Sequence, residues 1–424
     1  MKKRIIAAVL AGMLIVSAGG CGNGTASSGN AVDNSNGMAT ESSAGQAIAS
    51  ARQDENADAD TKEGGGTALS LMQEVNTGDE QIIDDNYRTW YEVFVYSFFD
   101  SDGDGIGDLN GLTEKLDYIN DGDPATDTDL GCNGIWLMPV MPSTTYHKYD
   151  VTDYCDIDPE YGTMDDFKNL IAACHERGIN VIIDLVMNHT SSQHEWFKTA
   201  ADYLKNLPEG AEPDASECPY VDYYNFSKEM QGGYSKLDGT DWYYEAQFWS
   251  EMPDLNLGSQ AVRDEFDKIV DFWLDLGVDG FRLDAAKEYY SGSVDKNVEV
   301  LSWFHSMVKE KKEDAYIVAE VWTDQNTYAK YYESGIDSCF DFSFADSTGT
   351  ITSVLKNGSA SSYGKALVNL QDNLSQYSDS YIDAPFYTNH DMARGAGYYS
   401  GDDSEKQTKI AQAMNLLMSG SAFL

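Results

Sequence analysis

The chain has 424 residues, of which 42% are hydrophobic and 23% are charged, so it is long enough to bury a large core in one domain or several. Lys and Arg number 28 against 71 Asp and Glu, a formal net charge of −43, which argues against a nucleic-acid-binding protein because such proteins need clustered positive charge. Aromatic residues make up 12% of the chain, and flat apolar rings beside many carboxylates suit sugars as ligands, although most such rings fill protein cores.

The N-terminal residues have the pattern of an export signal. Three basic residues precede an apolar run over 5–16 that is short for a membrane-spanning helix, and small residues then lead to Cys21. Residues 1–21 resemble a bacterial lipoprotein signal, which implies lipidation of Cys21, attachment to a membrane through this lipid anchor and an extracellular, cell-surface location; ordinary secretion is the alternative. Residues 22–80 consist mainly of small and polar residues and predict a disordered tether.

Short apolar runs alternate with helix-like stretches in the rest of the chain. Continuous apolar strands separated by helices predict parallel strands that are covered on both faces. One connecting stretch, 261–276, places its apolar residues along one face of a helix. Seven runs predict a (β/α)8 barrel, the TIM barrel of the α/β class, with an eighth strand beginning near Ser421. The seven runs are residues 91–98, 134–140, 180–186, 278–284, 315–321, 339–344 and 384–390.

Polar residues follow four of these predicted strands. They are Asp184, Asn188 and His189 after the third strand, Arg282 and Asp284 after the fourth, Glu320 after the fifth, and Asn389, His390 and Asp391 after the seventh. The active site of this barrel type forms at the C-terminal ends of the strands, so we expect these residues to converge. A single Asp after a strand is usually a helix N-cap, but four coordinated occurrences predict a functional site.

Paired carboxylates without a metal motif, a phosphate loop or a Ser/His/Asp pattern indicate glycoside cleavage. One carboxylate attacks the anomeric carbon, while the other stays protonated and donates to the leaving oxygen. In a retaining enzyme the two groups lie roughly 5 to 5.5 Å apart. A third carboxylate can hydrogen-bond the sugar and favour its cationic transition state.

Several short segments resemble the signature regions of the α-amylase family of glycoside hydrolases, in the family's order. They are DLVMNH at 184–189, GFRLDAAKE at 280–288, EVW at 320–322, TNHD at 388–391 and a further region, MPDLN, at 252–256. The resemblance runs from about Tyr87 to the C-terminus. It implies retaining hydrolysis of α-1,4-glucosidic bonds in starch or maltooligosaccharides through a covalent glucosyl-enzyme intermediate, with an α-glucan as the substrate.

The resemblance also implies roles for single residues. Asp284 would be the nucleophile, Glu320 the general acid/base and Asp391 the transition-state stabiliser. Arg282 would hold Asp284 ionised through charge proximity. Further contacts to the substrate would come from Tyr149, Asp150, His189, His390 and Lys287, of which Tyr149 would stack under the cleaved sugar and Lys287 would face the leaving group. A buried histidine considered alone is more often a satisfied core residue.

A long interval interrupts the barrel repeat after the third predicted strand. Residues 190–253 look like the small inserted domain that this family carries there, and their rings serve either as sugar platforms or as a small core. The barrel would then consist of residues 81–189 and 254–424. Because the chain stops as the eighth strand should begin, we expect a barrel truncated at strand 8, with exposed strand edges, and a fragment of a longer enzyme that lacks the family's C-terminal domain.

The segment DSDGDGIGD at 100–108 copies the first nine positions of a calcium loop. The ligands would be Asp100, Asp102, Asp104, the carbonyl of Ile106, and Asp108. Position twelve is a glycine rather than a bidentate Glu, so a signalling EF-hand is not expected. The segment resembles the structural calcium loop after the first strand in some family members, which implies a structural Ca²⁺; an acidic turn without an ion is the alternative.

Departures from the family pattern keep other functions open. Glu288 stands where many α-amylases have a His that serves a calcium site, so we do not expect calcium between Asn188 and Asp254. Ala285 and the sequence MPDLN favour α-1,4 over α-1,6 cleavage. The alternatives are a non-catalytic glucan-binding lipoprotein, a transglycosylase, or an α-1,6-acting glucosidase with the same catalytic residues. No particular oligomeric state is predicted.

Overall fold

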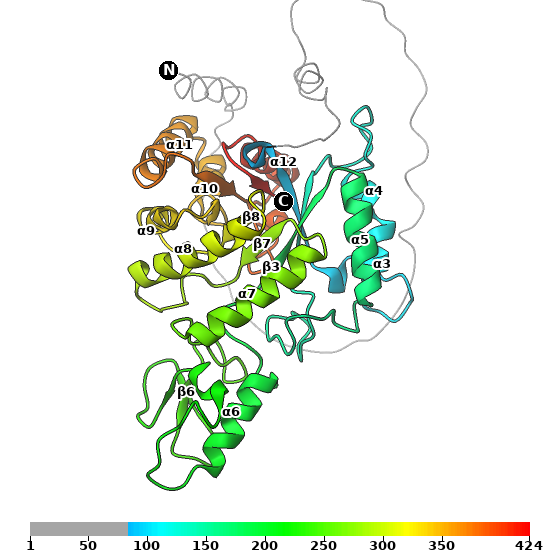
Figure 1. Ribbon diagram of the computed structural model, residues 1–424. Helices are drawn as coiled ribbons and strands as arrows, with labels where there is room; N and C mark the ends of the chain where they lie inside the picture. Colours follow the sequence, from blue (N-terminus) through cyan, green and yellow to red (C-terminus); the bar gives the residue numbers. More distant parts are fainter. Residues whose placement is uncertain (1–83) are drawn as a thin grey trace, which may run out of the picture. The chain divides into compact units, whose positions relative to one another are not determined.

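The structure, a computed structural model, describes residues 84–424 of the chain (Figure 1). The predicted signal, Cys21 and the predicted tether lie outside these residues. Within the described range, every helix is too short or too polar to cross a membrane.

Eight parallel strands form one sheet, in the order β10-β9-β8-β7-β3-β2-β1-β11. Helices connect them, so the structure confirms the (β/α)8 barrel of the α/β class (Figure 1). All seven predicted runs overlap a strand of this sheet. The strands are β1 (Thr89–Val93), β2 (Gly134–Leu137), β3 (Asn180–Leu185), β7 (Gly280–Leu283), β8 (Tyr316–Ala319), β9 (Ser338–Asp341), β10 (Ile382–Pro385) and β11 (Ala422–Phe423).

The eighth strand, β11, is present and joins the two edges of the sheet. Its residues pair with β1, with Phe423 opposite Trp90. On its other side Phe423 forms a parallel bridge with Phe386, and the Ser421 N–H donates to the carbonyl oxygen of Asp383 at 2.8 Å. The prediction of a barrel left open at strand 8 is therefore corrected, because two residues suffice to bond both neighbouring strands.

Large aromatic side chains fill the inside of the barrel. The ring of Trp90 stacks on Tyr316 of β8 with centroids 5.1 Å apart, and on Phe423 of β11 at 5.7 Å. Because β1 and β8 are not neighbours in the sheet, the first contact crosses the barrel. A Cβ atom at Gly134 would lie 2.3 Å from the Trp90 ring, so glycine is required there.

Helices form the outer layer of the barrel. On α7 (Gln260–Asp275), Val262, Phe266, Ile269, Val270 and Trp273 are buried, which confirms the predicted apolar face. The other helices around the barrel are α3 (Leu109–Glu114), α4 (Leu116–Ile119), α5 (Met164–Glu176), α8 (Val294–Lys311), α9 (Gln325–Ala329), α10 (Thr350–Asn357), α11 (Ala360–Leu374) and α12 (Ser404–Leu416). Short 3-10 turns occupy Asp85–Tyr87, Val95–Ser97, Pro219–Asp222, Lys330–Ser334 and Gly395–Gly397.

The segment between β3 and α7 forms α6 (Glu195–Asn206) and a small antiparallel sheet of β4 (Phe226–Ser227), β6 (Tyr243–Glu245) and β5 (Tyr234–Lys236). It lies beyond one end of the barrel (Figure 1). Its aromatic residues divide into buried and exposed ones. Tyr224 and Tyr244 are buried, whereas Phe248 and Trp249 are 54% and 47% exposed.

Candidate active site

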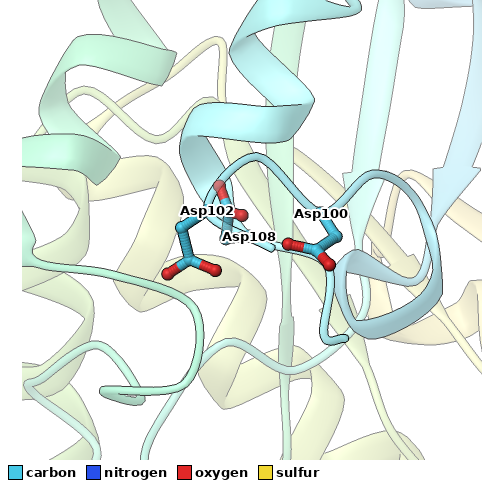
Figure 2. Close-up of side chains that lie close together, drawn as sticks. All are labelled: Asp100, Asp102 and Asp108. Carbon is cyan, nitrogen blue, oxygen red and sulfur yellow. The ribbon is translucent and has the colours of Figure 1, made fainter. Parts of the chain in front are cut away.

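Three carboxylates gather in the loop that follows β1 (Figure 2). The ligand atoms of Asp100, Asp102 and Asp108 all lie within 4.8 Å of one another. The N–H groups of Gly103 and Gly105 donate to Asp100 at 2.6 and 2.9 Å, and these bonds hold the pKa of Asp100 below its ordinary value. The group consists of hard oxygen donors of the kind that Ca²⁺ prefers.

The two other predicted ligands of this loop are arranged differently. Asp104 is not a member of the three-carboxylate group, and its carboxylate accepts a hydrogen bond from the Ile106 N–H at 2.7 Å. The side chain of Ile106 packs partly buried against the core. The structure therefore brings together three of the four predicted carboxylates, and the backbone carbonyl of Ile106 stays a predicted ligand.

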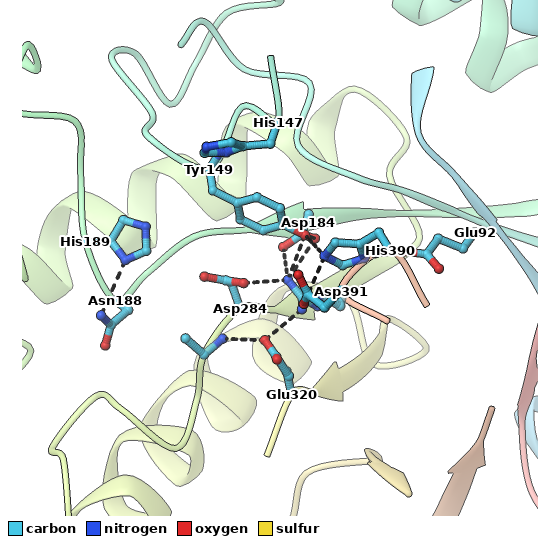
Figure 3. A network of polar contacts seen from close by, with 12 residues as sticks. Glu92, His147, Tyr149, Asp184, Asn188, His189, Asp284, Glu320, His390 and Asp391 are labelled. Carbon is cyan, nitrogen blue, oxygen red and sulfur yellow. Dashed lines mark hydrogen bonds and ion pairs between the residues drawn. The ribbon is translucent and has the colours of Figure 1, made fainter. Parts of the chain in front are cut away.

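A second group of carboxylates, Asp184, Asp284 and Glu320, lies at the C-terminal ends of three barrel strands (Figure 3), and all three accept hydrogen bonds from Arg282. Arg282 lies on β7 and is 1% exposed. Its Nη1 donates to the two carboxylate oxygens of Asp184 at 2.8 and 2.9 Å, and to Asp284 Oδ1 at 2.7 Å. Its Nη2 donates to Glu320 Oε2 at 2.7 Å. The predicted nucleophile and the predicted acid/base thus contact the same guanidinium group.

The backbone after the predicted nucleophile is strained. Ala285 has a φ of 46°, a left-handed conformation that costs free energy for a residue with a side chain. In this conformation its N–H donates to Glu320 Oε2 at 3.0 Å. Because Arg282 and Ala285 both donate to Oε2, Oε1 remains to carry a proton.

Burial and charge act in opposite directions on these carboxylates. Burial raises the pKa of Asp284 and that of Glu320, and Arg282 lowers both. The net direction is upward for each, so the pair retains a proton to a higher pH than isolated carboxylates do. Proton donation by one group and nucleophilic attack by the other both need such a pair.

Tyr149 and His390 extend the group toward β1 (Figure 3). The Tyr149 hydroxyl donates to Asp184 Oδ2 at 2.9 Å and lies 2.9 Å from His390 Nε2. Nδ1 of the His390 ring lies 2.5 Å from Glu92 Oε1, and Nε2 of this ring lies 3.3 Å from Asp391 Oδ2. The rings of Tyr149 and His390 stack, with centroids 5.6 Å apart.

A cavity of about 350 Å³ opens over this group. Six predicted site residues line it: Tyr149, His189, Asp284, Glu320, His390 and Asp391. Asp391 is the most open of the predicted catalytic carboxylates, with 45% of its side chain exposed. Burial lowers the pKa of His189 to about 4, so this ring is neutral and suited to hydrogen-bonding a neutral ligand.

A second cavity of about 380 Å³ adjoins the first and shares Phe248, Ala285 and Glu320 with it. The predicted contact Lys287 lines this second cavity, and its Nζ donates to the carbonyl oxygen of Trp322 at 3.4 Å. Trp322 is 46% exposed, and its ring stacks on Phe342 with centroids 4.8 Å apart. Glu320 therefore lies between two adjoining spaces.

Asp150 does not contact either cavity, which differs from the prediction of a substrate contact. It is fully buried, and its carboxylate accepts hydrogen bonds from the hydroxyls of Ser143, Thr144 and Thr145. The Ser191 hydroxyl donates to it at 3.3 Å. Asp150 therefore holds the loop before Tyr149 in place and joins it to Ser191.

Two residues of the network had no predicted role. Asp184 was expected among the strand-end residues, and it shares Arg282 with Asp284 and Glu320. Glu92 is a charged residue within the otherwise apolar run of the first strand, which is a signal that sequence reasoning passed over.

Asn188 and Asp254 meet at the junction of the barrel and the inserted segment. The Asn188 side-chain amide donates to Asp254 Oδ1 at 3.2 Å, and the Gln247 N–H donates to Oδ2 at 3.0 Å. Asp254 is 4% exposed, and its burial raises its pKa to about 8. These direct hydrogen bonds join the two parts of the chain.

Known proteins are similar to this chain in sequence and in fold. A family profile described as alpha amylase, catalytic domain, matches residues 92–424. The chain is 42% identical over 341 residues to Alpha-amylase 3 of Dictyoglomus thermophilum, covering 79% of this chain and 62% of that protein. It is 30% identical over 378 residues to an alpha-glucosidase of Apis mellifera, covering 78% of this chain and 60% of that protein.

A solved structure, Eubacterium rectale Amy13B, matches with a TM-score of 0.77 and 61% sequence identity, covering 84% of this chain and 68% of that chain. The present chain spans about three fifths of the length of Alpha-amylase 3 and of the Apis mellifera alpha-glucosidase.

Proposed function

Because the chain belongs to the alpha-amylase family of glycoside hydrolase catalytic domains, we propose that it cleaves α-1,4-glucosidic bonds in starch or maltooligosaccharides with retention of configuration. The observation that carries this proposal is the contact of Asp284 and Glu320 with one guanidinium group at the wall of one cavity. A retaining pair must lie about 5 to 5.5 Å apart, and a shared arginine keeps two carboxylates close. A relative named alpha-amylase supports the choice of substrate, while relatives named oligo-1,6-glucosidase and trehalose synthase/amylase keep other bonds open to the test below.

The mechanism follows from the positions of the carboxylates. Asp284 attacks the anomeric carbon and forms a covalent glucosyl-enzyme, while Glu320 donates its proton to the leaving oxygen. Glu320 then takes a proton from water, which attacks the intermediate and releases the sugar. Asp391, which lines the same cavity, hydrogen-bonds the hydroxyls of the distorted sugar.

The second cavity supports a sugar on the leaving-group side. Glu320 borders both cavities, so a bond positioned at Glu320 has the sugar under attack in the first cavity and the leaving sugar in the second. The exposed ring of Trp322 offers this sugar an apolar face. An oligosaccharide with units on both sides of the bond therefore fits better than a monosaccharide derivative.

Reducing-sugar release from soluble starch tests the proposal. The wild-type chain should release maltooligosaccharides, and Asp284→Asn should abolish release while starch binding remains. The exposed Asp165→Asn variant on α5 is the matched control. Starch binding without turnover in every variant would instead identify a glucan-binding protein, and products longer than the substrate would identify a transglycosylase.

We also propose that the acidic loop binds a structural Ca²⁺ through Asp100, Asp102 and Asp108. The geometric fit supports this, because three carboxylates within 4.8 Å of one another form a site of high negative charge. A cation there would relieve the repulsion among them and stiffen the loop after β1. Asp108 also accepts from the Gly111 N–H at 2.7 Å at the start of α3, so the ion would brace that helix.

A lipid anchor at Cys21 is proposed from the signal pattern alone, and with it attachment of the protein to the cell surface. Incorporation of labelled fatty acid into the wild-type chain, and its loss in Cys21→Ser, tests this assignment. Release of the wild-type protein into the medium without label would support ordinary secretion instead.

A further inference from the structure

A charged residue of the first strand contacts His390. Glu92 Oε1 lies 2.5 Å from His390 Nδ1, and the side chains of the two residues are 13% and 15% exposed. Glu92 does not line the active-site cavity. A carboxylate only accepts hydrogen bonds, so Nδ1 carries a proton and donates it to Glu92.

The other ring nitrogen of His390 faces oxygen atoms. Nε2 lies 2.9 Å from Tyr149 Oη and 3.3 Å from Asp391 Oδ2. The single proton of the Tyr149 hydroxyl is used in the 2.9 Å bond to Asp184, whose two oxygens both accept from Arg282 Nη1. Oη therefore accepts from Nε2, and a ring that donates from both nitrogens is an imidazolium.

The contacts from His390 through Tyr149 to Asp184 offer the second imidazolium proton another position, on Asp184. If the proton moved to Asp184, this residue would donate to Tyr149, and Tyr149 would donate to a neutral His390. Burial favours this move, since it raises the pKa of Asp184 to about 7, whereas Arg282 opposes it because its Nη1 contacts both Asp184 oxygens. Glu92 opposes it because a neighbouring negative charge stabilises the imidazolium. The charged groups at the two ends thus keep the proton on His390.

The titratable and charged groups around His390 come from five parts of the chain. They are Glu92 on β1, His147 and Tyr149 after β2, Asp184 on β3, Arg282 and Asp284 at β7, and Asp391 beside it. Burial lowers the pKa of His390, the hydrogen bond and charge of Glu92 raise it, and the net direction is upward.

We propose that Glu92 is a positioning residue of the active site, which keeps His390 as an imidazolium and thereby directs Tyr149 to Asp184 and an N–H group to Asp391. The proposal rests on the proposed hydrolysis, in which His390 and Asp391 hold the sugar under attack. Glu92 acts through His390. Its effect is therefore expected on the protonation of that ring and on the pH dependence of the reaction.

Nitrogen NMR of the full chain with labelled histidine tests the protonation directly. The chain has six histidines, and the His390→Gln spectrum assigns the relevant signal. We expect His390 of the wild-type chain to be protonated on both nitrogens at pH 7. The midpoint of its pH titration should fall by about 1 to 3 pH units in Glu92→Gln. The exposed Glu114→Gln on α3 should leave the midpoint unchanged. A neutral His390 in the wild-type chain at pH 7, or an unchanged midpoint in Glu92→Gln, would overturn the proposal.

The pH profile of starch hydrolysis gives the second readout. On the alkaline side of the profile, the activity of Glu92→Gln should begin to fall at a lower pH than that of the wild-type chain. The acidic side of the profile should be unchanged. A uniform loss at every pH would indicate a structural role only and overturn the assignment. If the wild-type chain hydrolyses no glucan, the proposed function fails, while the NMR titration still decides the role of Glu92.

Discussion

Two groups of carboxylates in this molecule have opposite environments. The strand-end group, Asp184, Asp284 and Glu320, is buried around one arginine, whereas in the loop group Asp102 is exposed, Asp100 is half-buried and Asp108 is buried, with no arginine among them. Burial raises the pKa values of the first group, while backbone N–H donors lower the pKa of Asp100 in the second. The difference teaches that burial and local donors set the protonation of a carboxyl: a desolvated carboxyl holds a proton to higher pH, and one bonded by backbone N–H groups stays charged.

The largest expected effect concerns proton transfer in the strand-end group. Glu320→Gln should reduce hydrolysis of maltooligosaccharides by up to about 10⁴-fold, because the leaving oxygen then receives no proton. For an aryl α-glucoside, whose leaving group departs without protonation, the first step should be affected much less. Steady-state and burst kinetics with both substrates measure this difference.

The control for this experiment is the exposed Glu310→Gln on α8. An equal loss with both substrates would contradict the assignment of Glu320 as the acid and would point to a defect in folding or binding.

Removing the positive charge of Arg282 from the strand-end group should destabilise the folded protein. Arg282→Met leaves buried carboxylates without their partner, which costs about 3 to 5 kcal/mol of the free energy of unfolding. The loss should grow as the pH rises, because the remaining carboxyl groups must then give up protons in a buried site. Urea unfolding at pH 5 and pH 8 measures both effects.

Arg177→Met provides the matched comparison, since Arg177 contacts Asp117, whose side chain is 71% exposed. That pair should contribute less than about 1 kcal/mol. Equal losses for the two variants would mean that burial does not distinguish the two arginines.

The loop group should respond to calcium rather than to an arginine. Free Ca²⁺ at 100 times its dissociation constant should stabilise the chain by about 2.7 kcal/mol, and a chelator should remove this gain. Asp102→Asn should weaken the response, whereas Asp127→Asn, in another acidic loop, should leave it intact. The measurement is the Tm of thermal unfolding at increasing calcium concentrations. A Tm that does not change with calcium would refute the site.

A pH-dependent effect is expected at Asp254, a buried carboxyl whose two oxygens accept from the uncharged amides of Asn188 and Gln247. Its folded pKa of about 8 lies above the unfolded value near 3.8. Its contribution to stability is therefore complete below about pH 4 and is lost as the pH rises toward 8, by up to about 1.4 kcal/mol per pH unit. Asp254→Asn should flatten this decline in urea unfolding between pH 5 and 8, and an unchanged slope would exclude Asp254 as its source.

The sequence predicted the parts of the site that depend on repeating patterns. Apolar runs located the strands, and the polar residues after them located Arg282, Asp284 and Glu320, because strand ends in a parallel barrel meet at one face. Residues whose roles depend on side-chain direction were harder. Asp150 does not follow a predicted strand, and its side chain accepts a hydrogen bond from Ser143 of the loop just before it. Glu92 contacts the ring of His390, which is 298 positions away in the sequence.

Closure of the barrel has a consequence for folding kinetics. The Trp90 indole N–H donates to the Ser421 hydroxyl at 2.9 Å across a sequence separation of 331 residues. Contacts of such high contact order form late, because the chain between them must first lose most of its loop entropy. Substitutions at this seam, such as Phe423→Ala, should therefore accelerate unfolding more than they slow refolding, and the seam should exchange its amide hydrogens before the strands on the opposite side of the barrel.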